Sequence, residues 1–166
     1  MKSKSVLFFL FVCLATTLLQ GQDTSYFDKY NNQKLGTIAP NFSLEVYKTN
    51  TLKDLNSFDA DSIYLFFYDP FCEHCHKEIK KLKKDKSLKR AIKEQSLVII
   101  TIAPDISKDV WSKTVKKMPK YWCNAYSNDT DMIIKKYLWK VPELFVLDKN
   151  KVVRRIEMYR ESEQDE

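Results

Sequence analysis

The stretch SIYLFFYDPFCEHCHKEIKKLKK, residues 62–84, decides the fold, because it joins an apolar strand to a helix through a closely spaced cysteine pair. Its first seven residues, SIYLFFY, are continuously apolar or aromatic after the serine, which is typical of a strand buried on both faces of a sheet. Asp69-Pro70 ends this strand. The following residues predict a helix over Cys72–Lys84, whose apolar positions recur at helical spacing: Cys75, Ile79 and Leu82.

The rest of the chain alternates between the two periodicities. A phase break at 85–87 predicts a second helical piece, and a buried strand and a helix follow it. The expected helices are Leu88–Glu94, Asp109–Met118 and Asp129–Leu138, the last with Asn128 or Asp129 as its N-cap. The expected strands are Phe42–Tyr47, Leu97–Ala103, Tyr121–Tyr126, Glu143–Leu147 and its hairpin partner Lys151–Glu157, while Leu52–Phe58 suggests a helical turn or a loop.

This order predicts an α/β fold with a central mixed sheet flanked by helices. Alternating strands and helices favour parallel strands covered on their faces, and the closing hairpin adds antiparallel ones. A chain of 166 residues is long enough for one domain of ordinary size. Only two glycines occur, and neither GxGxxG nor GxxxxGK[ST] is present, which argues against glycine-based nucleotide sites.

The first 21 residues are typical of a secretory signal peptide. Lys2 and Lys4 precede an uncharged apolar run, Val6–Leu19, that is shorter than the ~20 residues needed to span a bilayer. An uncleaved anchor or a lipid on Cys13 are the alternatives. Removal of residues 1–21 takes away two lysines and no acid, which lowers the net charge from +6 to +4.

We therefore expect export to the periplasm or cell envelope, with no stable membrane span after cleavage. Residues 22–34 are polar and predict a flexible arm, residues 35–157 the folded domain, and residues 158–166 an acidic tail. Residues 77–93 carry nine basic side chains, which we interpret as a solvated helix face able to steer anionic substrates rather than as a nucleic-acid site.

Cys72 and Cys75 carry the predicted chemistry. Residues i and i+3 lie on one side of a helix, close enough for their sulfurs to bond. The first cysteine sits where free backbone N–H groups and the helix dipole favour a thiolate, which is the nucleophilic form. Cys72 is thus the expected nucleophile and Cys75 the resolving thiol. Cys123, between aromatic residues, is expected to be a buried thiol.

Other readings of CEHCH remain open at this point. A zinc site would need about four ligands, and one helical turn cannot wrap Cys72, His74, Cys75 and His76 around one ion, so we expect no metal. A structural disulfide is a further alternative. CxxCH is also the attachment motif of c-type haem, with His76 as the ligand, although haem proteins of that class are mainly helical. We expect no cofactor.

Four segments together resemble the TlpA/ResA-like branch of the thioredoxin superfamily: LGTIAPNFSL, SIYLFFYDPFCEHCHKE, LVIITIAPD and KVPELFVLDKNKVVRRIE. The resemblance covers residues 35–157. It implies a cis bond before Pro142, a substrate contact through the backbone of Val141, and a proton-handling role for Glu78. The chain departs from the family pattern at Phe71 and His74, and we expect the usual C-terminal helix to be missing or very short.

The resemblance further implies a thiol–disulfide oxidoreductase, acting on thiol or disulfide proteins of the cell envelope and supplied by a donor that could be a membrane protein. Glu73 should raise the pKa of Cys72, whereas a protonated His74 should lower it. We favour a reductase because of the overall resemblance. A disulfide-forming oxidase or isomerase of the same fold, or a non-enzymatic binding module, are the alternatives.

Overall fold

Two apolar strands, β3 (Ser62–Phe67) and β4 (Leu97–Ile102), form the parallel centre of the sheet. They are seen in a computed structural model of the chain, which describes residues 34–138 and 140–158. Aromatic and β-branched side chains favour this extended conformation. Most of these side chains are buried, which confirms the interpretation of both segments as core strands.

The sheet has seven strands in the order β2-β1-β5-β4-β3-β6-β7. β4 and β5 are parallel, and β6 is antiparallel to both β3 and β7. β1 is antiparallel to β2 and β5. The sheet is therefore mixed, as predicted. The remaining strands are β1 (Ser43–Val46), β2 (Thr51–Asp54), β5 (Cys123–Tyr126), β6 (Glu143–Asp148) and β7 (Val153–Met158).

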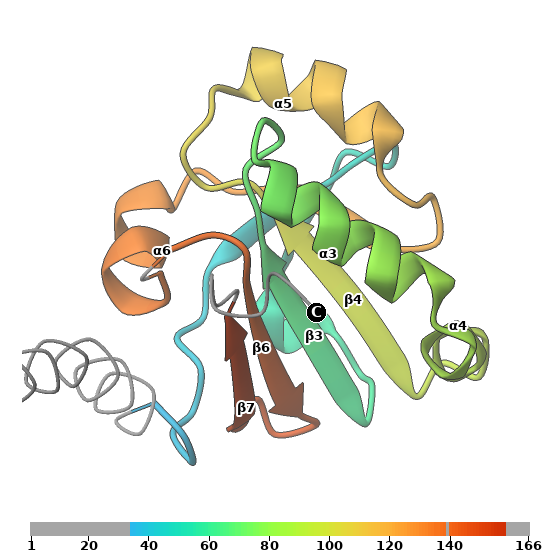
Figure 1. The fold of residues 1–166 in the computed structure, drawn as a ribbon. Coiled ribbons are helices and arrows are strands. Elements are labelled where there is room, and N and C mark those ends of the chain that lie inside the picture. The colour runs from blue at the N-terminus through green and yellow to red at the C-terminus, as the bar shows by residue number, and fades with distance from the viewer. Residues whose placement is uncertain (1–33, 139, 159–166) are drawn as a thin grey trace, which may run out of the picture. The chain divides into compact units, whose positions relative to one another are not determined.

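Helices cover both faces of the sheet. On one face, α3 (Glu73–Lys84), α4 (Lys86–Lys93) and α5 (Lys108–Thr114) pack on an apolar cluster with β3 and β4. Figure 1 shows α3 crossing in front of these two strands. On the other face, α6 (Thr130–Lys136) packs on a second cluster. This arrangement confirms the predicted α/β fold, a mixed sheet flanked by helices.

Asp85 explains the break between α3 and α4. Its backbone ends α3, and its side chain accepts the N–H groups of Ser87 and Leu88 at 2.8 and 3.1 Å, capping α4. The predicted phase break is therefore a capped corner between two helices.

One local prediction was wrong. The segment expected to be a turn or loop begins with β2, which pairs with β1, and only Leu55–Ser57 is a 3₁₀ turn. The β2 side chains are mostly exposed on both faces of the sheet. The sequence of this edge strand therefore lacks the alternation of apolar and polar residues by which a half-buried strand is identified. Asp129 is the N-cap residue of α6, as predicted, but its side chain makes no capping bond. It instead accepts the N–H and Oγ–H of Ser43, both at 2.7 Å.

Several predictions concern segments outside the described residues. These are the leader (1–21), all but the last residue of the arm (22–34), and the tail (158–166) apart from its first residue. No helix within the described residues is long and apolar enough to cross a membrane. Among the described residues no helix follows β7, whose last residue is Met158.

Candidate active site

Cys72 is the N-cap residue of α3, as predicted from the strand–CxxC–helix order. Its Sγ accepts the backbone N–H of Cys75 at 3.3 Å, so the sulfur occupies a position usually taken by a capping oxygen. The N–H groups at a helix start have no partners within the helix and favour an anion there. The side chain of Cys72 is half-buried and remains accessible to a second molecule.

Cys75 lies beneath Cys72 and is fully buried, at 0% exposure. Its Sγ accepts the backbone N–H of Asp69 at 3.4 Å. Burial raises the pKa of the Cys75 thiol well above its ordinary value, and the hydrogen bond with the Cys72 side chain raises it further. The N–H of Asp69 acts against this increase, while the charges of Cys72 and Asp69 add to it. The two thiols are therefore unequal in access: Cys72 is half-buried and Cys75 is fully buried.

Further hydrogen bonds fix the turn between β3 and α3. Asp69 Oδ1 accepts the N–H of Phe71 at 2.7 Å, and the Asp69 carbonyl accepts the N–H of Cys72 at 3.1 Å. The ring Nε2 of His76 lies 2.9 Å from the Pro70 carbonyl oxygen. Phe71 is presented on this turn with 72% of its surface exposed. The turn thus holds an exposed aromatic side chain immediately before Cys72.

Tyr68 and Asp69 are site residues that the sequence predictions missed. Tyr68 is 2% exposed, and its Oη has no hydrogen-bond partner among the described residues. Burial raises the pKa of Tyr68, and the charge of Cys75 raises it further, which places this hydroxyl in the electrostatic environment of the thiols. The signal available in the sequence was position: both residues lie between the buried strand and the cysteine pair.

The peptide bond between Val141 and Pro142 is cis, as the family resemblance implied. Pro142 is buried, and Val141 is half-buried. Val141 packs against both apolar clusters, including the one that contains Cys75. The predicted substrate-contact residues are thus brought to the cluster that holds the resolving cysteine. Glu143, which follows them, is fully buried at 0% exposure, and the sequence predictions did not single it out.

The three polar residues predicted to tune the site occupy different environments. Glu73 points into solvent, with its side chain 80% exposed and its Oε1 3.3 Å from Lys77 Nζ. Glu78 has a side chain that is 31% exposed, and its Oε2 lies 3.6 Å from Lys81 Nζ. His74 is half-buried. Within the described residues, each of the two glutamates forms its ion pair with a lysine of α3. Neither of these ion pairs includes Cys72 or Cys75.

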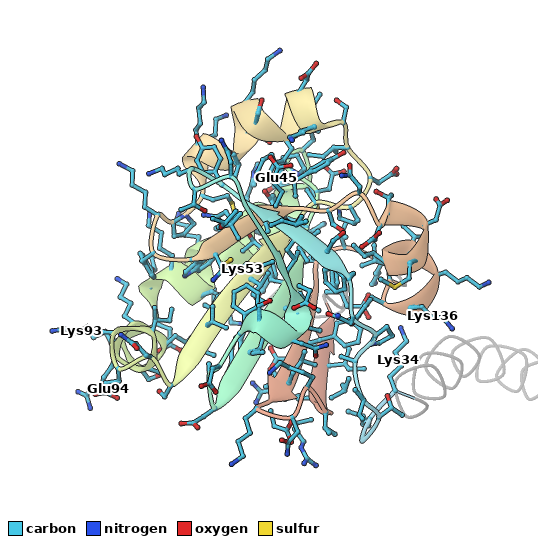
Figure 2. The ribbon with its side chains drawn as sticks, turned by 180° about the vertical axis from the view of Figure 1, so that it is seen from behind. Lys34, Glu45, Lys53, Lys93, Glu94 and Lys136 are labelled. Atoms are coloured by element: carbon cyan, nitrogen blue, oxygen red, sulfur yellow. The ribbon has the colours of Figure 1, made fainter. Side chains whose placement is uncertain are left out.

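Cys123 is at the start of β5 and packs against the cluster under α6, whereas Cys75 belongs to the cluster under α3. Burial raises the pKa of Cys123 to about 11, against a smaller opposing effect of the Lys53 charge. Figure 2 shows Lys53 on the side of the sheet seen from behind. Cys123 is therefore a half-buried thiol on the opposite face from the CxxC pair, less buried than predicted.

No group of three or more His, Cys, Asp or Glu side chains within the described residues could hold a metal ion. The same part of the chain contains Cys72, Cys75 and Cys123 as free thiols, with no disulfide between them. The geometry of the CxxC pair is that of a dithiol: one accessible sulfur at a helix N-terminus and one buried sulfur behind it.

Comparisons with known proteins agree with this geometry. The model of the AhpC/TSA family matches residues 35–156. A thioredoxin-like protein from Bacteroides caccae is 32% identical, with a TM-score of 0.67 over 74% of this chain and 44% of that chain. The chain thus spans less than half the length of that protein. No curated protein matches the sequence.

Two further structures share the fold. The C-terminal domain of an uncharacterized protein from Bacteroides fragilis is 30% identical, with a TM-score of 0.68 over 77% of this chain and 92% of that one. The thioredoxin domain of a thiol-disulfide oxidoreductase from Bacteroides vulgatus is 19% identical, with a TM-score of 0.65 over 76% of this chain and 89% of that one. Since the family model covers most of its length, this chain belongs to the AhpC/TSA family, and it has a thioredoxin-like fold with a CxxC pair at Cys72 and Cys75.

Proposed function

We propose that this protein is a thiol–disulfide oxidoreductase that reduces disulfides of exported proteins. The observation that carries the proposal is the inequality of the two thiols. Cys72 caps α3 with a partly accessible sulfur, while Cys75 is fully buried directly behind it. Dithiol exchange requires this combination of one attacking and one resolving sulfur.

The reaction proceeds in two balanced steps. The Cys72 thiolate attacks one sulfur of a substrate disulfide, forming a mixed disulfide and releasing the first substrate thiolate. Cys75 then loses its proton and attacks Cys72 Sγ, which releases the second substrate thiolate and leaves a Cys72–Cys75 disulfide. Two electrons pass to the substrate, whose thiolates take up two protons. A donor dithiol, borne by a soluble or a membrane protein, must reduce the pair again.

The environment of Cys75 supports the reducing direction. A pair becomes a strong oxidant when its reduced form is stabilised, usually through a favoured thiolate. Here burial and the hydrogen bond with the Cys72 side chain chiefly disfavour a thiolate on Cys75, and the Asp69 charge adds a smaller effect. Glu73, beside Cys72, adds a second negative charge, although its exposure and its pairing with Lys77 weaken the effect. His74 acts in the opposite direction when it is protonated.

The remaining roles follow from position. Val141, next to the buried Pro142, offers its backbone to an extended substrate segment on one side of the thiols. Glu78, one helical turn after Cys75, takes part in moving the proton that Cys75 loses. The signal-like leader directs this chemistry to the periplasm or cell envelope, where disulfides persist.

Turbidity from insulin reduction by dithiothreitol tests the proposal with the mature chain. We expect clear acceleration by the wild-type protein and by Cys123→Ala, which removes the thiol on the other face. Cys72→Ser should abolish the acceleration while the protein still folds, as judged by circular dichroism. An unreactive Cys72–Cys75 pair without acceleration would contradict the proposal and favour a binding module. Activity retained by Cys72→Ser would overturn the role assigned to Cys72.

A further inference from the structure

An open groove of about 570 Å³ lies beside the turn that carries Cys72. One wall is a single face of α3, and the opposite wall is the segment from the end of α5 to Pro119. Tyr68, Pro70 and Phe71 close the end of the groove that leads to the cysteines. The groove thus reaches Phe71, the residue immediately before Cys72 in the chain.

The groove has an apolar lining near the cysteines. Ile79 and Met118 contribute from the two walls, and the largely exposed ring of Phe71 stands at its end. Aromatic side chains are enriched in protein–protein interfaces, so Phe71 and the apolar residues beside it suit a contact with a partner. His76 also lines the groove, and its ring is held at the Pro70 carbonyl.

The charged side chains that line the groove are basic. Lys80 and Lys83 project from α3, and Lys117 faces them from the other wall, whereas no carboxylate is among the lining residues. Within the described part of the chain, the ion pairs of α3 are made by Lys77 and Lys81, and none involves the three groove lysines. These three positive charges are therefore available to an anionic partner.

This groove is separate from the pocket next to the cis proline. Val141 and Lys140 line that second pocket together with Asp69 and Asp105, so its charges are mixed. Tyr68 is the residue that lines both. Two hollows therefore border the turn that carries the cysteines. The charged residues that line the pocket are of both signs, and those that line the groove are all basic.

We propose that the basic groove binds an acidic segment of the substrate protein, adjacent to the disulfide that Cys72 attacks. The inference rests on the proposed function and names its substrate class: exported proteins whose disulfide is flanked by aspartates or glutamates. Apolar contact at Phe71 and Ile79 anchors the segment, and Lys80, Lys83 and Lys117 select its charge.

Two disulfide-containing peptides test this proposal. They have the same length and differ only in a flanking run of glutamates or of lysines, and their reduction by the mature protein is followed by thiol release. We expect kcat/KM at low salt to be about tenfold higher for the acidic peptide, within the range of electrostatic steering. The difference should shrink as added salt screens the charges. Equal rates for both peptides would overturn the groove assignment and leave the proposed function intact.

Charge reversal locates the effect. The double substitution Lys80→Glu with Lys83→Glu should reverse the preference, so that the basic peptide reacts faster. The matched control, Lys89→Glu with Lys93→Glu, makes the same change of charge on α4 and should keep the preference for the acidic peptide. Figure 2 shows Lys93 on α4, far from α5. Loss of the preference in both double variants would overturn the inference, because net charge rather than the groove would be responsible.

Two other results are informative. If the wild-type protein reduces neither peptide, the proposed function and the groove assignment both fail. If the groove lysines are instead required for binding to vesicles containing anionic lipid, without any peptide preference, they serve a membrane surface and the inference is overturned.

Discussion

The backbone N–H of Cys75 donates to Sγ of Cys72 across 3.3 Å, while the thiol of Cys75 is itself completely buried. The first turn of α3 therefore supports the accessible sulfur and hides the second one. This asymmetry assigns the order of events in the proposed exchange, since of the two sulfurs only that of Cys72 is accessible to a substrate disulfide. Substitutions of Cys72 and of Cys75 should therefore block the reaction at different steps.

The substitution Cys75→Ser should trap the reaction halfway. Cys72 would still attack a substrate disulfide, but no second thiol would release it, so a mixed disulfide accumulates. Mass spectrometry after incubation with a disulfide peptide should show one adduct, mapped to Cys72. Cys72→Ser should give no adduct at Cys75 on the same time scale, because that thiol is buried. Preferential labelling of Cys75 would reverse the assigned roles.

Asp69→Asn should speed the resolving step. Asparagine can still accept the N–H of Phe71, so the turn is kept while a negative charge near Cys75 is removed. The pKa of Cys75 should fall, so more of this thiol is ionised and the mixed disulfide on Cys72 should be resolved about threefold faster, as measured by stopped-flow kinetics. Glu73→Gln is the matched control, because it removes a charge that is exposed and paired with Lys77. An equal or larger acceleration in Glu73→Gln would contradict this account of the site.

Tyr68→Phe should stabilise the folded protein. The Tyr68 hydroxyl is buried without a hydrogen-bond partner among the described residues, so its removal should raise the free energy of unfolding by about 1 kcal/mol. Tyr137→Phe is the control: its Oη donates to the Pro40 carbonyl, and losing that bond should lower the free energy by about 1 kcal/mol. Urea denaturation of the reduced proteins measures both. A clear loss of stability in Tyr68→Phe would show that the hydroxyl is satisfied.

Cys123 should weaken the protein at alkaline pH. Burial raises its pKa from 9.0 to about 11, so the folded protein keeps the proton that the unfolded chain releases. The contribution is fully present below pH 9 and is lost as the pH rises through about 11, up to roughly 3 kcal/mol. The fall in the free energy of unfolding between pH 8 and pH 11 should be smaller in Cys123→Ala. An identical pH dependence in both proteins would contradict a Cys123 thiol that folding keeps neutral.

The core of the fold was predictable because its signals are local and strong. The apolar runs that became β3 and β4, and the phase break that Asp85 caps, could be identified from periodicity alone. β2 was not predicted, since an exposed edge strand is stabilised by pairing with β1 rather than by burial. The bond from Ser43 to Asp129 joins residues distant in the sequence, so a side chain expected to cap α6 is used elsewhere.

The sequence predicted the positions of the two cysteines at the helix start and the cis bond before the proline. It predicted less about the residues that surround them. The spacing of Cys72 and Cys75 after a strand implied the helix cap, and the resemblance implied the cis bond before Pro142. The burial of Tyr68 and the contact of Asp69 with Cys75 depend on how the turn folds over the sheet. The basic groove also required the fold, because Lys117 comes from a different segment than Lys80 and Lys83.

A redox titration of the Cys72–Cys75 pair tests the central claim most directly. The mature Cys123→Ala protein would be equilibrated in dithiothreitol buffers of defined potential at pH 7, and its free thiols would be counted by alkylation and mass spectrometry. We predict a single two-electron transition at a reducing potential, near the value of about −270 mV that thioredoxin shows. A transition near about −120 mV, at the strongly oxidising end of the scale, would contradict the reductase. A pair that never forms a reversible disulfide would contradict the exchange chemistry altogether.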